Sequence, residues 1–221
     1  MTGDLFDHLG VQEKAAEEPV RLGEGAFIFP GMALPQAEAL LDAARAIARK
    51  APFRHLITPG GHRMSVAMTA CGDWGWNSDR KGYRYTRTQP ETGEAWPPIP
   101  DSFERLVRQA TMAAGFSEAP LQSGLINLYR PGTRLSLHQD RDEEATDVPI
   151  VSVSLGVAAT FLWGGLTRKD PMRRFRLSHG DVVVWGGPSR LVFHGVAPLA
   201  RSTHPATGEC RVNLTFRRVT R

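Results

Sequence analysis

Hydrophobic positions recur with helical spacing in two segments of the chain. In residues 34–50, "LPQAEALLDAARAIARK", apolar side chains at 37, 40, 41, 44, 47 and 48 form one face, and Pro35 suits the first turn. A second helix is predicted to begin near Asp101, where Asp101 and Glu104 have the spacing of a capping box. Gly115 is the expected stop signal of this helix.

The second half of the chain consists of short strand-like runs separated by turn signals. From about residue 120 the runs are GLINLYR, IVSVSLG, ATFLWG, FRLS, DVVVWGG, LVFHGV and RVNLTFRRV. Sequences such as RPGT, SHGD and GGPS mark turns between them. Many short strands with few helices favour an antiparallel sandwich or small barrel such as a jelly roll, with the two helices packed outside it. The predicted fold class is therefore α+β.

The remaining segments are assigned around this β core, which we place at about residues 120–221. Residues 1–24 are polar and lack periodicity, so a loose arm is expected there. "FIFPGM" at 27–32 predicts a short strand and a turn, and residues 51–100, rich in Gly, Pro and polar aromatics, predict hairpins and loops. Because no repeat or linker interrupts the pattern, we interpret residues 1–221 as one domain.

Composition is consistent with this single domain. The chain has 221 residues and 41% hydrophobic content, enough for one sizeable core. The two cysteines, Cys71 and Cys210, are far apart and are expected to be thiols in a reducing compartment. No apolar run approaches the ~20 residues needed to cross a bilayer, and the N-terminus lacks the apolar segment of a signal peptide. We therefore expect a cytoplasmic protein without membrane contact, and a monomer by default.

The charge distribution changes this picture. A net charge of +4 is small, and an ordinary solvated surface would account for it. However, residues 54–90 contain six basic and two acidic side chains, so this segment alone carries a net +4. The same segment contains Trp74, Trp76, Tyr83 and Tyr85. Basic and aromatic side chains interleaved in this way suit phosphates and stacked bases, which favours a nucleic-acid partner.

A candidate metal site lies in "LSLHQDRDE". Residues two apart in a strand share a face, so His138 and Asp140 are expected to converge. An HxD pattern alone is a weak signal, since a third ligand is needed. His194 in "RLVFHGV" is the best candidate, on a late strand that a rolled-up sheet could bring beside the first. Two histidines and one carboxylate form the facial triad of non-haem Fe(II) oxygenases, which leaves three positions open on the ion.

The C-terminal strand suggests a site for an anion. In "RVNLTFRR", Arg211, Asn213, Thr215 and Arg217 alternate with apolar residues and share one face. A half-exposed strand with its polar face in water would give the same pattern. Two arginines on one face also suit a small dianion, because each guanidinium offers a bidentate fork to a carboxylate. In the strand "INLYR", the polar residues Asn127 and Tyr129 share a face in the same way.

Together these motifs resemble the AlkB family of bacterial DNA-repair dioxygenases. The resemblance is carried by NLYRPGTRLSLHQDRDE, HGDVVVWGG, SRLVFHGV and RVNLTFRR, and by MSVAMTACG followed by GW and GYRY. These blocks run from about residue 58 to residue 218 in the family's order. HxD…H combined with RxNxTFR is far more specific than either motif alone. The N-terminal arm resembles the family only loosely.

The resemblance implies a double-stranded β-helix, or jelly roll, that uses Fe(II), O2 and 2-oxoglutarate. The residues at the family's iron-ligand positions are His138, Asp140 and His194. Those at its 2-oxoglutarate positions are Asn127, Tyr129, Arg211, Asn213 and Arg217. Residues of about 51–100 would form a nucleotide-recognition lid, in which Trp76 stacks on the damaged base and Tyr83 reaches the nucleic-acid backbone. The other residues at substrate-pocket positions are Met68, Tyr85, Ser136, Asp142 and Arg168.

The implied reaction is oxidative demethylation of N1-methyladenine and N3-methylcytosine in DNA, with release of formaldehyde and succinate. Alkylated single-stranded DNA is the expected substrate, with duplex DNA or RNA as alternatives. A 2-oxoglutarate hydroxylase acting on RNA, protein or a small molecule is the nearest rival interpretation, although the basic aromatic segment argues against a small molecule. A jelly-roll binding module would not need the paired arginines. A zinc hydrolase would not need a site for a 2-oxoacid.

Overall fold

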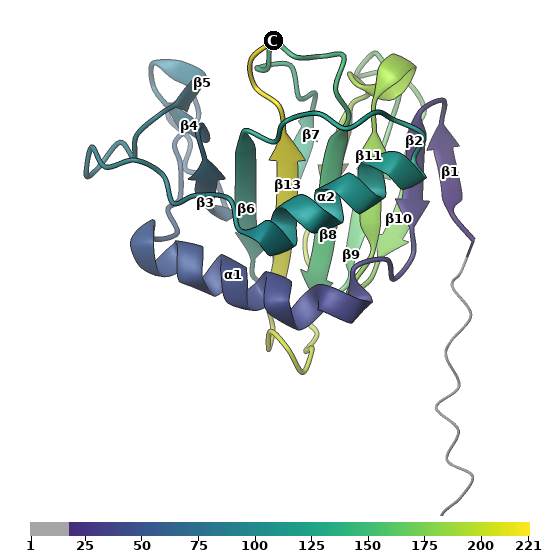
Figure 1. The fold of residues 1–221 in the computed structure, drawn as a ribbon, viewed down its shortest axis with the longest axis horizontal. Helices are drawn as coiled ribbons and strands as arrows, with labels where there is room; N and C mark the ends of the chain where they lie inside the picture. The colour runs from purple at the N-terminus through teal and green to yellow at the C-terminus, as the bar shows by residue number, and fades with distance from the viewer. Residues whose placement is uncertain (1–17) are drawn as a thin grey trace, which may run out of the picture.

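The structure, a computed structural model, describes residues 18–221 (Figure 1). The helical elements are η1 (Leu34–Gln36), α1 (Ala37–Lys50), α2 (Asp101–Ala113) and η2 (Gly187–Ser189). The strands of the first half are β1 (Val20–Gly23), β2 (Ala26–Phe29), β3 (Ala67–Gly72), β4 (Gly75–Asp79) and β5 (Gly82–Thr86). Those of the second half are β6 (Ser123–Tyr129), β7 (Leu135–His138), β8 (Ile150–Gly156), β9 (Ala159–Trp163), β10 (Arg173–Leu177), β11 (Val182–Trp185), β12 (His194–Val196) and β13 (Arg211–Arg217).

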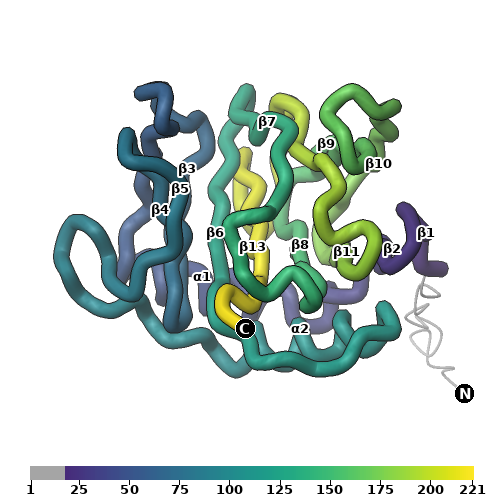
Figure 2. The backbone as a smooth tube through the Cα atoms, turned by 90° about the horizontal axis from the view of Figure 1, so that it is seen from above, coloured from purple at the N-terminus to yellow at the C-terminus, as the bar shows by residue number. Residues whose placement is uncertain are grey.

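Two antiparallel sheets form the core, as the strand pattern predicts. The larger sheet has the order β1-β2-β11-β8-β13-β6-β3, and the smaller has the order β10-β9-β12-β7. Viewed from above, the smaller sheet lies on one side of the larger and the two helices lie on the other (Figure 2). This is the predicted jelly-roll arrangement with flanking helices. From β6 to β13 the chain crosses repeatedly between the two sheets, so residues distant in sequence face one another across the interior.

Helices α1 and α2 cover the outer face of the larger sheet (Figure 1). Their apolar stripes, including Leu40, Ile47, Phe103 and Leu106, are buried in one cluster with Leu214 and other apolar residues of β8, β11 and β13. The predicted helical periodicity of 34–50 is confirmed, except that its first residues form the short turn η1. By covering the outer face, the helices leave the opposite face of β13 pointing into the space between the sheets.

The ends of α2 are only partly as predicted. The N-cap residue is Pro100, which has extended geometry, and no side chain caps the helix. Asp101 and Glu104 both lie inside the first turn, so the predicted capping box is wrong. Their carboxylates still favour this end, because the N-terminus of a helix carries partial positive charge. Gly115 has φ +80°, the left-handed geometry of a residue that follows a helix end, which confirms the stop signal.

Two predicted segment boundaries need correction. Residues 20–23, which we assigned to a loose arm over 1–24, form β1 and pair with β2. Residues 1–17 of that arm lie outside the described part of the chain. Within residues 51–100, predicted as a lid, β3 is an edge strand of the larger sheet and pairs with β6. Only β4 and β5 form a separate hairpin, which projects beside β3 (Figure 1).

The structure also describes the two cysteines and the length of the helices. Cys71 is buried, Cys210 is half-buried, and both are free thiols. Burial raises the pKa of the Cys71 thiol to about 12. No helix in residues 18–221 is long and apolar enough to span a bilayer.

Candidate active site

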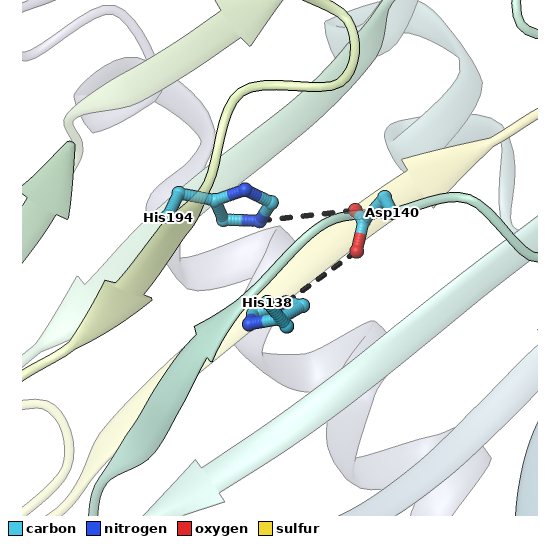
Figure 3. A group of neighbouring side chains, drawn as sticks. All are labelled: His138, Asp140 and His194. Atoms are coloured by element: carbon cyan, nitrogen blue, oxygen red, sulfur yellow. Dashed lines mark ion pairs between the residues drawn. The ribbon is translucent and has the colours of Figure 1, made fainter. Parts of the chain in front are cut away.

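His138, Asp140 and His194 meet at one point between the sheets (Figure 3). β7 ends at His138 and β12 begins at His194, and these two residues are register partners in adjacent strands. Asp140 lies two residues beyond the end of β7 and turns its carboxylate toward both rings. Its Oδ1 is 3.4 Å from Nε2 of His138, and its Oδ2 is 3.9 Å from Nε2 of His194. One ligand atom from each residue lies within 4.8 Å of the others, so the predicted convergence is confirmed.

Backbone carbonyls orient both imidazole rings. Nδ1 of His138 lies 2.9 Å from the carbonyl oxygen of Ser136, and Nδ1 of His194 lies 3.0 Å from that of Val192. A carbonyl oxygen only accepts, so each Nδ1 must carry the proton. The lone pair of a neutral ring is then on Nε2, which faces Asp140. This is the tautomer that a metal ligand requires.

Gly195 allows the two histidine strands to lie close together. A Cβ atom at this position would lie 2.7 Å from the carbonyl oxygen of Leu135 in β7. Real Cβ atoms essentially never approach backbone atoms so closely. The glycine in "HGV" is therefore part of what brings His194 beside His138.

Electrostatics favour metal-binding protonation states of Asp140 and His194. Burial lowers the pKa of His138, but its hydrogen bond to the Asp140 carboxylate outweighs burial and raises this pKa above its ordinary value. Burial lowers the pKa of His194 to about 4, with a further contribution from the nearby His138. Burial alone would raise the pKa of Asp140, but the charge of Arg217 and the two histidines outweigh it and hold this pKa well below its usual value. At neutral pH Asp140 is therefore ionised and His194 is neutral. Both can donate a lone pair to a divalent ion.

The polar face of β13 lies in the interior beside this cluster. Arg211, Asn213, Thr215 and Arg217 are all buried, so the alternative of a strand with its polar face in water is wrong. β13 pairs with β6 so that Arg211 is opposite Tyr129 and Asn213 is opposite Asn127. Nδ2 of Asn127 donates to Oδ1 of Asn213 at 3.1 Å. The five residues predicted to hold 2-oxoglutarate are thus neighbours on two adjacent strands.

Arg211 is a buried cation without a counterion among residues 18–221. Its side chain is 1% exposed, Nη2 donates to Oγ of Ser154 at 2.9 Å, and the guanidinium lies 4.9 Å from the centre of the Tyr129 ring. Nε and Nη1 of Arg211 and the hydroxyl of Tyr129 have no hydrogen-bond partner in the described structure. Burying an unpaired charge is costly, so these donors fit an anionic ligand such as a carboxylate.

Arg217 is already paired with the candidate metal ligand. Its Nε and Nη2 donate to Oδ2 of Asp140 at 3.1 and 2.7 Å, and its Nε lies 3.3 Å from Oε1 of Glu143. Nη1 of Arg217 has no partner in residues 18–221. This orphaned donor, like those of Arg211, fits a dianion with two separated carboxylates. The residues present therefore fit both Fe(II) and 2-oxoglutarate.

The β4–β5 hairpin contacts the chain just beyond the candidate metal ligands His138 and Asp140. Trp76 on β4 stacks on Tyr83 of β5, with ring centres 5.6 Å apart, and Tyr83 is 48% exposed. Nε1 of Trp76 donates to Oδ2 of Asp142 at 3.0 Å. Tyr85, the register partner of Trp76, donates its hydroxyl to Oε1 of Glu143 at 2.5 Å. The aromatic side chains of the hairpin therefore contact Asp142 and Glu143, which follow Asp140 in the sequence by two and three residues.

The other predicted pocket residues have different surroundings. Met68 is 3% exposed and belongs to a buried cluster with Tyr129, against which Trp76 packs. Ser136 is exposed, and its carbonyl oxygen lies 2.9 Å from Nδ1 of His138. Arg168 is exposed, with its guanidinium 5.0 Å from the ring centre of Phe193, the neighbour of His194. The structure thus brings Met68 near the hairpin, whereas Arg168 lies over Phe193, the residue before the candidate ligand His194.

Three buried residues beside the site were missed by sequence reasoning. Glu143 lies in the acidic run "DRDEEATD", which suggests a solvated loop, and Arg190 follows a turn signal in "GGPSR". Trp185 is 1% exposed, its ring centre is 4.9 Å from that of His194, and its Nε1 has no partner in the described structure. No local pattern identifies these residues, because their partners lie in distant segments.

The fold and the site together define a class of protein. Two histidines and one carboxylate meet in a jelly roll, with Asp140 and His194 buried and His138 half-buried, beside an arginine that has no counterion within residues 18–221. This is the arrangement of a non-haem iron oxygenase. In agreement, the family model described as "2OG-Fe(II) oxygenase superfamily" matches residues 25–217. Members use Fe(II), 2-oxoglutarate and O2, and these are the cofactors of this enzyme.

Comparison with known proteins narrows the class. The chain is 51% identical over 214 residues to "Alpha-ketoglutarate-dependent dioxygenase AlkB" of Salmonella typhimurium, covering 97% of this chain and 96% of that protein. It is also 51% identical to the protein of the same name from Escherichia coli, over 91% and 92% of the two chains. The chain therefore belongs to the AlkB family within this superfamily, as its motifs predict.

Two further relatives extend the comparison. The solved structure of OsALKBH1 superposes with a TM-score of 0.81 at 28% identity, covering 91% of this chain and all of the other. "DNA N(6)-methyladenine demethylase ALKBH1C" of Arabidopsis thaliana is 36% identical over 65% of this chain, but only 37% of that longer protein is covered. The superposition on OsALKBH1 agrees with the jelly-roll fold described above.

Proposed function

We propose that this single-domain dioxygenase removes methyl groups from ring nitrogens of DNA bases, such as N1-methyladenine and N3-methylcytosine. The observation that carries the proposal is the aromatic hairpin beside the His–Asp–His group, with Trp76 hydrogen-bonded to Asp142. Membership of the AlkB family supports the reaction class, and the similarity to a DNA N(6)-methyladenine demethylase of Arabidopsis supports DNA as a substrate. The basic segment 54–90 supports a polyanionic partner.

In this proposal His138, Asp140 and His194 coordinate Fe(II) through Nε2, a carboxylate oxygen and Nε2. Asn127, Tyr129, Arg211, Asn213 and Arg217 bind 2-oxoglutarate, with each arginine directed at one carboxylate. The bound iron, 2-oxoglutarate and O2 supply the oxidising chemistry, which converts the co-substrate to succinate and CO2 and the methyl group to formaldehyde. The protein's own side chains orient the reactants and keep the interior free of bulk water.

The hairpin recognises the damaged base. Trp76 releases Tyr83 and stacks on the base, while Tyr83 and nearby cations meet the backbone. Asp142 faces an exocyclic amino group, and its negative charge favours the cationic ring of a base methylated at its pairing edge. Met68, Tyr85, Ser136 and Arg168 line or approach the same pocket. A duplex base must be flipped out at a cost of roughly a few kcal/mol. A methyl on the pairing edge lowers that cost, and a single strand removes it, so single-stranded DNA is the preferred substrate.

The proposal is tested by incubating the protein with Fe(II), ascorbate, 2-oxoglutarate and an oligonucleotide that contains one N1-methyladenine. We expect unmodified adenine and an equimolar yield of formaldehyde and succinate. Parallel single-stranded DNA, duplex DNA and RNA substrates rank the strand types, and His138→Ala should abolish turnover. A preparation that binds iron and 2-oxoglutarate but yields no formaldehyde from any methylated strand would contradict the proposal.

The proposal also covers the cellular location and the oligomeric state of the protein. The free cysteines suit a reducing compartment, so we place the protein in the cytoplasm. We also propose that it acts as a monomer, which light scattering during gel filtration would check.

A further inference from the structure

Glu143 and Arg190 form a buried ion pair that the ligand set does not include. Nη2 of Arg190 lies 3.1 Å from Oε2 of Glu143, and their side chains are only 3% and 2% exposed. Removing two charges from water is costly, and a buried ion pair adds little stability over well-packed apolar side chains. A pair placed directly behind the metal ligands therefore calls for a functional explanation.

Arg190 joins the two segments that carry the metal ligands. Its Nη1 donates to the carbonyl oxygen of Asp140 at 2.6 Å, and its Nε donates to that of Val148 at 3.1 Å. Arg190 itself lies four residues before His194. One rigid guanidinium thus fixes the backbone of Asp140 relative to the segment that leads into β12.

Glu143 joins the hairpin to the co-substrate pocket. Its Oε1 accepts the hydroxyl of Tyr85 at 2.5 Å and lies 3.3 Å from Nε of Arg217, while its Oε2 accepts from Arg190. Arg217 in turn donates twice to Asp140. A continuous chain of contacts, half-buried at Tyr85 and buried beyond it, therefore runs from the hairpin to Asp140 through the carboxylate of Glu143.

The charges of this cluster balance. Asp140 and Glu143 carry two negative charges, and Arg190 and Arg217 carry two positive charges. Glu143 shares Arg217 with Asp140, so Arg217 is held from two sides and its Nη1 is left without a partner. Without Glu143, Arg217 would keep its two hydrogen bonds to one oxygen of Asp140 but would lose the contact that holds it from the second side. The direction of its free donor would then be less tightly fixed. An oriented donor binds a carboxylate with less loss of rotamer freedom.

We propose that Glu143 and Arg190 are positioning residues that couple the β4–β5 hairpin to 2-oxoglutarate binding. Tyr85 is the contact on the hairpin, and Arg217 is the contact in the pocket. Docking of the hairpin on Glu143 therefore favours the orientation of Arg217 that accepts the co-substrate, and by linkage a bound co-substrate favours the docked hairpin. This inference rests on the proposed function for the identity of the hairpin's ligand.

The experiment measures binding of 2-oxoglutarate to protein loaded with Mn(II), by calorimetry without turnover. Glu143→Gln keeps the shape but removes the charge, and should raise the Kd by about tenfold, the scale of a lost charge-assisted bond. Tyr85→Phe removes one hydroxyl at the hairpin and should raise the same Kd by roughly threefold. The double variant should be no worse than Glu143→Gln alone, because both substitutions break one chain of contacts. Glu118→Gln makes the same chemical change in an exposed ion pair, with Arg108 at 3.6 Å, and should leave the Kd unchanged.

A second readout separates positioning from general destabilisation. With the methylated oligonucleotide, Glu143→Gln should raise the KM for 2-oxoglutarate more than it lowers kcat, and Arg190→Lys should do so more weakly because it keeps the charge. If Glu143→Gln fails to fold, Tyr85→Phe and Arg190→Lys carry the test through the same Kd. Wild-type affinity in the variants, or additive effects in the double variant, would overturn the coupling. Neither outcome affects the proposed function, which only the wild-type formaldehyde assay decides.

Discussion

The two arginines of β13 differ in what neutralises them. Arg217 pairs with Asp140 and Glu143, whereas Arg211 has no acidic partner in residues 18–221. Burial accordingly lowers the pKa of Arg211, while for Arg217 the carboxylates outweigh burial and raise it. In the sequence the two residues are equivalent ends of one motif. Because their surroundings differ, removing the charge of Arg211 and removing that of Arg217 should change the free energy of unfolding in opposite directions.

Arg211→Met should stabilise the ligand-free protein and abolish 2-oxoglutarate binding. The substitution removes an uncompensated buried charge and replaces it with an apolar side chain of similar length. The gain in unfolding free energy is expected to be about 1 to 2 kcal/mol. Urea denaturation and calorimetric titration measure the two effects. A variant that is less stable than the wild type would show that the Ser154 and Tyr129 contacts outweigh the cost of the charge.

Arg217→Met should have the opposite effect on stability. Here the substitution leaves the two carboxylates of Asp140 and Glu143 with a single guanidinium, that of Arg190. One buried negative charge is then left without a positive partner. Breaking a buried pair in this way costs about 3 to 5 kcal/mol. The same denaturation experiment compares the two methionine variants directly. Equal changes in both would contradict the charge assignment of the site.

At the scale of elements, the site is built from strand ends. The i, i+2 spacing of His138 and Asp140 is predictable from the sequence, because it depends only on an extended backbone. The pairing of His194 with His138 is a long-range register that no local pattern specifies. The sequence offered His194 as the best candidate on a late strand of a rolled-up sheet, and the family resemblance supported that choice. The failed capping box has a local origin instead. Asp101 and Glu104 have the required spacing, but Pro100 before them takes the N-cap position.

Gly195→Ala should separate the two histidine strands. Its Cβ would lie 2.7 Å from the carbonyl oxygen of Leu135, so β12 must move away from β7 and carry His194 with it. We expect metal affinity to fall by at least about tenfold, since displacement of one of three ligands loses more than the ~1.4 kcal/mol that a factor of ten represents. Titration with Mn(II) measures the effect. Gly60→Ala, whose Cβ would make only an ordinary 3.6 Å contact with His62, is the matched control.

The β4–β5 hairpin should weaken in acid. Asp79 at the end of β4 accepts hydrogen bonds from Arg84 and from the backbone of Lys81, and these lower its pKa from 3.8 to about 2. A depressed pKa means that the pair stabilises the hairpin above about pH 4 and that this contribution is lost as pH falls toward 2. An NMR titration of the Asp79 carboxyl should give a midpoint near 2 in the wild type. Arg84→Gln should move it toward 3.8, and Arg87→Gln should leave it in place.

At the scale of the whole molecule, the two faces of the larger sheet have separate tasks. The outer face is covered by α1 and α2 through apolar contacts, and the inner face carries the polar residues of the site (Figure 2). The alternation of β13 predicts this division, since both sets of residues are visible in "RVNLTFRR". The cluster around Glu143 is not predictable in this way. It combines side chains from residues 85, 140, 143, 190 and 217, and only the closed jelly roll brings those segments together.

The distribution of charge predicts how salt acts on the two ligands. Binding of a methylated single strand should weaken as salt rises, because cations of segment 54–90 displace counterions from phosphates, with a slope of about −0.7 per contact. Arg80 and Lys81 are exposed in the turn between β4 and β5, so replacing both by Gln should reduce the slope by about 1 to 2. Arg105→Gln with Arg108→Gln removes the same charge from α2, on the face of the sheet away from the site, and should leave the slope unchanged. The arginines proposed to bind 2-oxoglutarate are buried, so its affinity should change little over the same range. Fluorescence anisotropy at several salt concentrations gives the slopes, and equal slopes for the two double variants would mean that the hairpin turn does not contact the strand.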